Sequence, residues 1–351
     1  LMNTNIRLLS LEYLRFFAAW NIFFGHYISF YIQFDLPETD GVFPKFLFPY
    51  AGLSVPMFFM MSGAIFVHNY YDLISQKAIN FQKFFQKRLA RLYPLHFLTL
   101  LIMAVLQFYY SKLSGDYFVY PFNDLKHFIL HLFFASHWGF EDGHSYNSVV
   151  WSVSHEIILY FLFFLVCFFL VNKINNKLRL FFGIFLVLFI FNFLFGKVLL
   201  KSIGAFFIGA LIYSLVEYFQ KFDQKKKIYL SIGTLIIFGI LNKIFKYCGL
   251  PFGSLGPITL FLLLNFDFLK INYPLIFEKF GIFLGNLSYS TYLIHIPVCT
   301  VMALIHLKVY QFNFLEIMPL LIYVSVVFIL SYFSYTFFEN PLRRYFSSRK
   351  N

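Results

Sequence analysis

Charge is scarce in this chain of 351 residues. Lys, Arg, Asp and Glu together make up 13% of the sequence, whereas hydrophobic residues make up 60%. Soluble domains use roughly a quarter of their residues as charged ones. The composition therefore predicts a membrane protein that crosses the bilayer several times, rather than a soluble domain with a single anchor.

Cysteine is also rare, and the common catalytic motifs are missing. The three cysteines, Cys167, Cys248 and Cys299, have no CxxC spacing, which predicts neither a disulfide framework nor a metal site. No GxSxG, Walker A, HExxH or dinucleotide-binding motif occurs, and His155-Glu156 lacks the second histidine of a zinc protease. We therefore expect no bound metal and neither serine-hydrolase nor metalloprotease chemistry.

Apolar runs recur along nearly the whole chain. A helix needs about 20 apolar residues to cross a bilayer, and about ten runs approach that length. No linker or fixed-period repeat divides them, so residues 1–351 are predicted to form a single all-α membrane domain, a bundle of about ten transmembrane helices. The predicted spans are 13–33, 50–70, 92–112, 150–171, 180–196, 202–219, 228–244, 251–269, 280–307 and 317–338.

The net charge of +12 is distributed unevenly between the two sides of these spans. Nineteen of the 28 lysines and arginines lie on one side and eight on the other, with Arg15 inside the first span. Cytoplasmic loops of membrane proteins carry such an excess. The pattern places the N- and C-termini in the cytoplasm and accounts for the basic excess without a nucleic-acid partner.

The longest outer segment is 113–149. Its stretch 125–138 is too short to cross a bilayer and predicts a re-entrant or interfacial helix. His127 and His131 have the i,i+4 spacing of metal ligands, but they lack a nearby third ligand, so we expect surface histidines. The polar outer loop 139–149 is either a cover over an outward-facing pocket, which we favour, or a solvated loop.

An arginine and a histidine share one face of the first predicted span. Arg15 and His26 are separated by ten residues, so their directions agree to within about 20° at a rise of about 16 Å. Ionisable side chains inside a bilayer are costly and are functional by default. The structural alternative is a snorkelling arginine and a histidine hydrogen-bonded inside the bundle.

The fourth predicted span contains Glu156, the one acidic residue that we place well inside an apolar span. Ser152 and Tyr160 lie one turn before and one turn after it, so the three share a face. A carboxylate at this depth indicates a functional group, because its burial is costly. The alternative is a structural glutamate paired with a buried cation.

Two other polar groups have one-turn spacing. Arg88 and Arg91 project together at i,i+3, an arrangement that suits phosphate oxygens but is also that of ordinary membrane-edge arginines. Ser288, Tyr292 and His295 form a stripe in the ninth predicted span, where hydroxyl groups often serve as polar contacts between helices. Spacing alone does not assign chemistry to either group.

Five motifs, each weak alone, follow one another along the chain: Arg15-(ten residues)-His26, Phe58-Phe59-Met-Met-Ser62-Gly63, Arg88-x-x-Arg91-x-x-Pro94, Asn147-x-x-x-Trp151-Ser-Val-x-x-Glu156 and Ser288-Tyr289-x-x-Tyr292-Leu-x-His295-x-Pro297. Together they resemble the acyltransferase 3 family of integral membrane O-acyltransferases, over nearly the whole chain. The family's fold is a bundle of about ten transmembrane helices, in agreement with the predicted spans.

The resemblance implies an enzyme of the cell (inner) membrane, embedded in the lipid bilayer, that modifies polysaccharides of the cell envelope. Members transfer acetyl or other short acyl groups from cytoplasmic acyl-CoA to hydroxyls of extracytoplasmic or lipid-linked glycans. Acetyl-CoA is therefore the expected acyl donor, and a glycan or lipid-linked saccharide is the expected acceptor.

The resemblance and the order of the residues in depth also imply catalytic roles. We expect His26 to be the general base toward the acceptor hydroxyl. Glu156 is expected to orient that hydroxyl or relay its proton, and His295 and Tyr292 to donate to the developing oxyanion. In an alternative route, His26 or another group takes the acyl chain covalently before passing it on.

The remaining motif residues are expected to bind the substrates. Arg88 and Arg91, with Arg15, are predicted to bind the phosphates of acyl-CoA, and Asn147, Trp151 and Ser152 the acceptor. A proton-coupled transporter of a lipid or glycan precursor is the alternative function, because it too would bury His, Arg and Glu. Such a transporter predicts inverted repeats with broken helices, which the sequence does not show.

Overall fold

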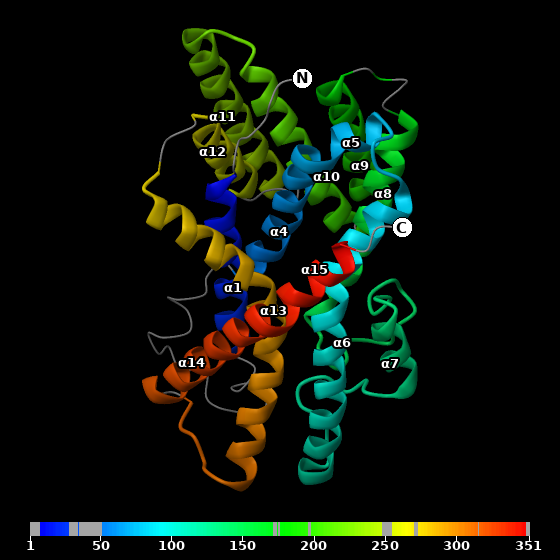
Figure 1. Cartoon of the computed structure of the whole chain (residues 1–351), viewed down its shortest axis with the longest axis vertical. Helices are drawn as coiled ribbons and strands as arrows, with labels where there is room; N and C mark the ends of the chain where they lie inside the picture. The colour runs from blue at the N-terminus through cyan, green and yellow to red at the C-terminus, as the bar shows by residue number, and fades with distance from the viewer. Residues whose placement is uncertain are drawn as a thin grey trace. The chain divides into compact units, whose positions relative to one another are not determined.

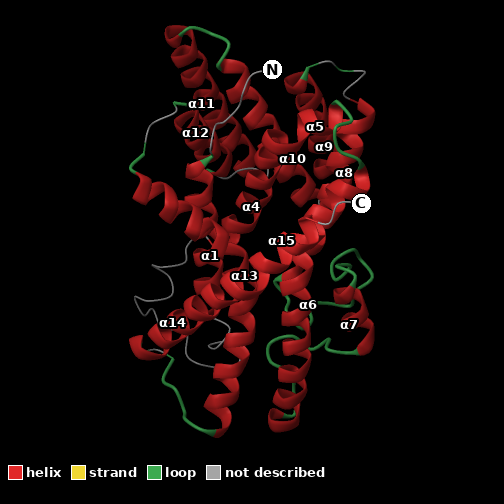
Figure 2. Ribbon diagram, viewed as in Figure 1, coloured by secondary structure: helices red, strands yellow, loops and turns green. Residues whose placement is uncertain are grey.

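A computed structural model gives the fold, and it describes residues 8–27, 34, 51–170, 174, 176–195, 198–247, 255–269, 273–314 and 316–348. All regular secondary structure in these ranges is helical (Figure 2), so the all-α prediction is confirmed. Residues 28–33 of the first predicted span, and Cys248, lie outside the described residues.

A helix occupies each of the predicted spans. In chain order the helices are α1 (Leu9–Tyr27), α4 (Ala51–Phe66), η1 (Val67–Tyr71), α5 (Asp72–Ser75), α6 (Phe81–Ser114), α7 (Leu125–Leu132), α8 (Val150–Leu170), α9 (Lys177–Phe195), α10 (Val198–Phe219), α11 (Gln224–Tyr247), α12 (Gly256–Phe268), α13 (Leu275–Lys308), α14 (Ile317–Phe333), η2 (Ser334–Glu339) and α15 (Asn340–Ser348). The segments η1 and η2 are π-helical turns that continue α4 and α14 without a loop.

Six helical stretches within the described ranges are long and apolar enough to cross a membrane. They are Gly52–Ser75, Phe81–Ser114, Val150–Leu170, Val198–Phe219, Leu275–Lys308 and Ile317–Phe346. This is the pattern of a multi-pass membrane protein. The count of ten crossings and the cytoplasmic position of the termini stay predictions.

The chain divides into two compact units. Unit 1 comprises Leu1–Arg15, Gly52–Asn80 and Leu159–Gly285, and unit 2 comprises Phe16–Ala51, Phe81–Ile158 and Asn286–Asn351. The helices α1, α8 and α13 contribute residues to both units, and the first residue of α4, Ala51, belongs to unit 2 while the rest of α4 belongs to unit 1.

Two glycines bring α4 and α10 into backbone contact within unit 1 (Figure 1). A Cβ added to Gly63 would overlap the carbonyl oxygen of Phe206, and a Cβ added to Gly209 would overlap that of Met60. Small residues allow such close approach between membrane helices. Gly63, which ends the second of the five motifs, thus has a packing role between α4 and α10.

Aromatic side chains fix α1 against α14 within unit 2. The rings of Phe23 and Tyr323 are stacked with their centroids 4.8 Å apart. The Tyr323 hydroxyl donates to the carbonyl oxygen of Phe23 at 3.3 Å, and the Tyr27 hydroxyl donates to that of Phe314, also at 3.3 Å. This packing holds the C-terminal half of α1, where His26 lies, in a defined orientation.

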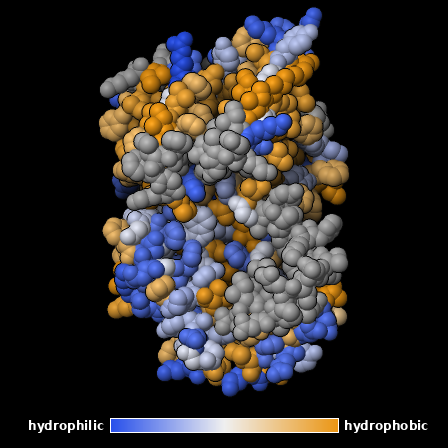
Figure 3. Space-filling view, turned by 180° about the vertical axis from the view of Figure 1, so that it is seen from behind, coloured by the Kyte–Doolittle hydropathy of each residue, from blue (hydrophilic) through white to orange (hydrophobic). Residues whose placement is uncertain are grey.

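Apolar side chains cover much of the molecular surface, as expected for helices surrounded by lipid. Large apolar residues are exposed along α11 and along the second half of α6. Figure 3 shows hydrophilic residues gathered on the left, where α7 and its flanking loops lie in this view. The surface around α7 thus includes a hydrophilic patch of unit 2.

Replacing Gly63 or Gly209 by Ala is expected to lower the melting temperature of the purified protein, because overpacking costs about 1–3 kcal/mol. Gly233→Ala in α11 is the matched control, since nothing lies within 4 Å of a Cβ built there. Ala favours helix over Gly, so the control should melt at the parental temperature or above. Equal melting of all three variants would show that α4 and α10 do not touch at these glycines.

Candidate active site

Two histidines from different helices meet in unit 2. Nδ1 of His26 in α1 and Nε2 of His295 in α13 are 3.0 Å apart, and the ring planes differ by 18°. His295 is fully buried, and His26 is partly exposed. The fold thus joins two predicted site residues that lie 269 positions apart in the sequence.

Their hydrogen bonds determine which ring nitrogens carry protons when both rings are neutral. Nδ1 of His295 lies 3.1 Å from the carbonyl oxygen of Thr291, which can only accept. His295 therefore carries its proton on Nδ1, and its Nε2 accepts the proton on Nδ1 of His26. Nε2 of His26 is left with a lone pair, the form that a general base requires. We call this chain from Thr291 to His26 the histidine relay.

Asn147 lies next to the relay as a consequence of Pro297. A proline inside a helix has no N–H and leaves the carbonyl four residues earlier without its helical donor. In α13 that carbonyl belongs to Leu293, and Nδ2 of Asn147 donates to it at 2.9 Å. Oδ1 of Asn147 is then buried with no hydrogen-bond partner in the described part of the chain. It is available to accept a hydrogen bond from a bound hydroxyl.

Two hydroxyl groups connect α13 to the first turn of α8. The Tyr292 hydroxyl donates to the carbonyl oxygen of Val149 at 2.9 Å and lies 2.8 Å from Oγ of Ser152. Oγ of Ser152 also donates to the carbonyl oxygen of Val149, at 3.2 Å, so both hydroxyl groups converge on this carbonyl. Tyr292 and Ser152 therefore position the start of α8 against α13.

Glu156 and Trp151 lie on either side of Ser152 in α8. Glu156 follows Ser152 by one turn and is partly exposed. The indole of Trp151 packs against the rings of His137 and His155, with centroid distances of 5.9 and 5.4 Å. One imidazole from the preceding loop and one from α8 itself thus pack against the indole of Trp151.

The three predicted phosphate-binding arginines fall into different units. Arg88 and Arg91 lie one turn apart in the unit 2 helix α6, where Arg88 is 8% exposed and Arg91 is more accessible. Arg15 belongs to unit 1, and its Nη1 forms a 3.2 Å ion pair with Glu12. The prediction that one helix carries both Arg15 and His26 is confirmed, because α1 is continuous from Leu9 to Tyr27.

The prediction that Glu156 is the one acidic residue well inside a span is wrong. Asp267 is 5% exposed in α12, and Glu339 is 2% exposed inside the stretch Ile317–Phe346. Glu339 accepts a hydrogen bond from the Ser290 hydroxyl of α13 at 2.8 Å. It was missed because the predicted span ended at 338, whereas η2 continues the helix. The available signal was Pro341, which is compatible with the first turn of a further helix.

The expectation of surface histidines at 127 and 131 is also wrong. Both side chains are 1% exposed. Nδ1 of His127 contacts Oδ1 of Asp124 at 2.8 Å, and Nε2 of His131 contacts Oγ of Ser145 at 3.1 Å. The segment 139–149 packs back onto α7 and buries them. No three His, Cys, Asp or Glu side chains among the described residues converge in a way that would hold a metal ion.

His144 also lies near the relay, although the sequence analysis did not select it as a site residue. Its ring stacks on that of His137 at 5.0 Å, and it interacts electrostatically with His26. Partial burial, followed by the charge of His137, lowers the pKa of His144. The histidines of the loop are therefore part of the surroundings of the candidate site.

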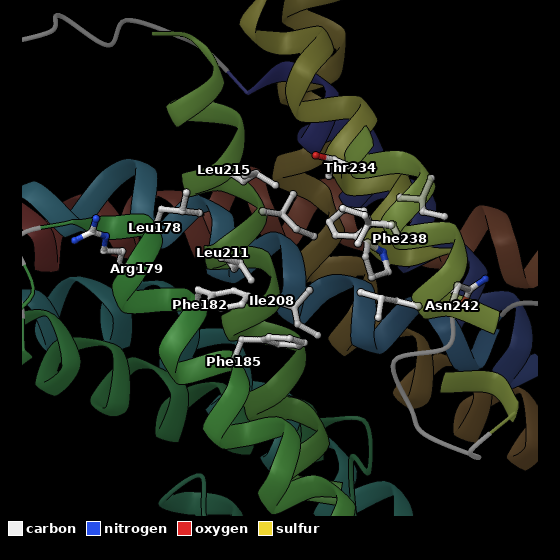
Figure 4. A pocket seen from close by; sticks show the side chains of 15 residues that line it. Leu178, Arg179, Phe182, Phe185, Ile208, Leu211, Leu215, Thr234, Phe238 and Asn242 are labelled. Carbon is white, nitrogen blue, oxygen red and sulfur yellow. The ribbon is translucent and has the colours of Figure 1, made fainter. Parts of the chain in front are cut away.

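A separate cavity of about 490 Å³ lies in unit 1 between α9, α10, α11 and α12 (Figure 4). Its walls are almost entirely apolar and include Phe182, Leu211 and Phe238, with Asn242 at one end. None of the sequence-predicted site residues lines it.

The helices define a class, a multi-pass membrane protein, and two histidines from distant parts of the chain pair inside its unit 2. The chain matches the family model described as an acyltransferase domain (Acyl_transf_3) over residues 8–337, which span both units. It therefore belongs to the acyltransferase 3 family, and the resemblance drawn from its motifs is confirmed. Comparison with curated proteins and with solved structures gives no match.

Acid is expected to destabilise unit 2 through His131. Burial, followed by the charge of His96, lowers the pKa of His131 from 6.5 to about 3. Between these values the unfolded chain binds a proton that the folded chain does not, so stability falls as the pH falls, by at most about 1.4 kcal/mol per pH unit. His131→Gln should flatten this dependence when melting is measured between pH 7 and pH 4. An unchanged slope would show that His131 does not contribute.

Proposed function

We propose that this protein is an O-acyltransferase of the cell (inner) membrane that moves an acetyl group from cytoplasmic acetyl-CoA to a hydroxyl of an extracytoplasmic or lipid-linked glycan. Membership of an acyltransferase family supports the transfer of an acyl group. The observation that carries the proposal is the histidine relay, because it leaves Nε2 of His26 able to deprotonate a hydroxyl.

His26 acts as base and then as acid in the proposed reaction. Its Nε2 takes the proton of the acceptor hydroxyl while the hydroxyl oxygen attacks the thioester carbonyl carbon. The carbon–sulfur bond then breaks, and the imidazolium of His26 returns the proton to the departing thiolate. The proton is conserved within the site, and the products are an ester and free coenzyme A.

His295 acts as a positioning residue in this proposal. It holds Nδ1 of His26 and so keeps the lone pair on Nε2, as the third member of a catalytic triad orients its histidine. An oxyanion role would need a proton on Nε2 of His295, which its contact with Thr291 disfavours. Tyr292, with Ser152, positions the start of α8 in the same way, since its proton goes to Val149.

Asn147 binds the acceptor in this proposal. Its free Oδ1 accepts a hydrogen bond from a hydroxyl, and sugars offer a second hydroxyl next to the one that reacts. Trp151 provides a flat apolar surface of the kind on which a sugar ring packs. Glu156 is proposed to orient the reacting hydroxyl or relay its proton from the adjacent turn of α8.

Arg88 and Arg91 bind the diphosphate of the donor in this proposal, because two adjacent guanidinium groups suit phosphate oxygens. A part for Arg15 in donor binding stays a prediction, since its observed partner is Glu12.

Direct transfer and a covalent acyl intermediate both use the lone pair of His26, and single-turnover labelling of the protein separates them.

His26→Ala is expected to lower kcat for acetyl transfer by about 10²- to 10⁴-fold, because the general base is lost. His295→Asn should lower kcat by roughly 10- to 100-fold through misorientation, with the KM for acetyl-CoA unchanged. The assay follows label from acetyl-CoA into envelope glycans, with protein in lipid nanodiscs. His306→Gln, at the far end of α13, is the control and should keep parental activity. A fully active His26→Ala variant would falsify the mechanism, and glycan uptake without transfer would support the transporter.

Asn147→Ala is expected to raise the KM for the acceptor roughly tenfold, because one buried hydrogen bond to a hydroxyl is lost. The KM for acetyl-CoA should stay at the parental value, and initial rates at varied acceptor and varied donor separate the two constants. Pro297→Ala restores a helical donor to Leu293 and removes the need for Asn147 there, so it should also raise the KM for the acceptor. A change confined to the donor KM would contradict this assignment.

A further inference from the structure

Two arginines of the last helix have no part in the site described so far. Arg343 and Arg344 lie in α15, which packs along α6, the helix of Arg88 and Arg91 (Figure 1). All four residues belong to unit 2. The C-terminal helix therefore brings a second arginine pair to the helix that carries the first.

Contacts around η2 show that the two pairs are neighbours. The phenol of Tyr335 in η2 lies within electrostatic range of Arg91, Arg343 and Arg344. Nη2 of Arg343 donates to Oδ1 of Asn340 at 3.3 Å, which directs this guanidinium toward the first turn of α15, next to Glu339. Arg91, Arg343 and Arg344 thus lie near the junction of η2 and α15, and Arg88 precedes Arg91 by one turn of α6. We call these four residues the arginine cluster.

The three elements that carry the cluster contain few carboxylates. Among the residues of α6, η2 and α15, Glu339 is the one acidic residue, and its carboxylate also accepts a hydrogen bond from Ser290. Lys83 and Lys87 add two further positive charges at the start of α6. Such an excess of positive charge favours a ligand with several negative charges.

The cluster lies a short distance from the relay along α13. Tyr289 donates to the carbonyl oxygen of Leu92, next to Arg91, at 2.7 Å, and Ser290 contacts Glu339. His295 follows Ser290 by five residues, a rise of about 7.5 Å. The pantetheine arm of coenzyme A is longer than this rise, so the arm of a donor held at the cluster is long enough to reach His26.

The order of the phosphate groups in coenzyme A indicates which phosphate each arginine pair binds. The diphosphate is closer to the thioester along the molecule than the 3′-phosphate of the ribose is. Arg88 is buried, whereas Arg343 is partly accessible and Arg344 is exposed at the edge of the cluster. The more buried pair, Arg88 and Arg91, thus suits the diphosphate. The more accessible pair, Arg343 and Arg344, suits the 3′-phosphate.

We propose that Arg343 and Arg344 of α15 bind the 3′-phosphate of the coenzyme A donor and so make the enzyme selective for CoA thioesters over donors that lack this phosphate. The inference rests on the proposed function, because it concerns the donor of that reaction. It assigns to the C-terminal helix a part in donor recognition that is separate from catalysis at His26.

Equilibrium binding of CoA and of 3′-dephospho-CoA to the purified full-length protein tests the proposal. The parent should bind CoA roughly tenfold more tightly than 3′-dephospho-CoA, because charge-assisted hydrogen bonds to one phosphate are lost. Arg343→Gln with Arg344→Gln should weaken CoA binding by the same factor and leave 3′-dephospho-CoA binding unchanged. Arg88→Gln with Arg91→Gln should weaken both ligands alike.

Lys112→Gln with Lys308→Gln is the control, since it removes the same charge from exposed positions outside the cluster. It should keep the parental preference for CoA. A double α15 variant that retains the preference, or that weakens both ligands equally, would overturn the proposal. A variant that binds both ligands as the parent does but loses activity only in anionic lipid would instead assign the arginines to lipid phosphates.

Ligand binding and acetyl transfer test the 3′-phosphate site and the acyltransferase mechanism separately. Absence of acetyl transfer by a parent that binds CoA with the expected preference would reject the acyltransferase mechanism and keep the 3′-phosphate site. Acetyl transfer that depends on His26, from a parent that does not distinguish the two ligands, would keep the mechanism and reject the site.

Discussion

The short stretch of α13 from 289 to 295 is the part of unit 2 on which the candidate site depends. Within two helical turns it forms hydrogen bonds to α6, to η2, to the start of α8 and to α1. Hydrocarbon offers no water to replace a lost hydrogen bond, so each of these contacts is costly to break. One helix thereby fixes the positions of four others and aligns the arginine cluster with the relay.

Pro297 shows how a break in helical bonding creates a binding group. A proline at this position leaves the carbonyl of Leu293 without its backbone donor, and the loop before α8 supplies Asn147 in its place. The amide is held by its nitrogen, and its oxygen is buried with no hydrogen-bond partner among the described residues. A helix without the proline would not need the loop, and Asn147 would have no reason to be buried.

Much of the helical pattern could be predicted from the sequence, because long apolar runs specify helices and one-turn spacing specifies faces. The pairing of His26 with His295 could not, since periodicity gives the face of a helix but not the helix that it meets. Glu339 was missed because a π-helical turn carries the helix beyond the apolar run. His127 and His131 were misjudged because local polarity does not reveal that residues 139–149 fold back over them.

The relay ends on a carbonyl rather than a carboxylate, which suits its place inside a membrane protein. A carboxylate beside His26 would put a permanent charge in the bundle, and burying it would cost free energy at every stage of the reaction. The carbonyl of Thr291 orients both rings without that cost, so the relay is neutral until the acceptor gives up its proton. In the proposed reaction, negative charge then develops on the thioester oxygen and on sulfur, in the field of the imidazolium of His26. The two histidines of the relay are thus charged only during the proposed transfer.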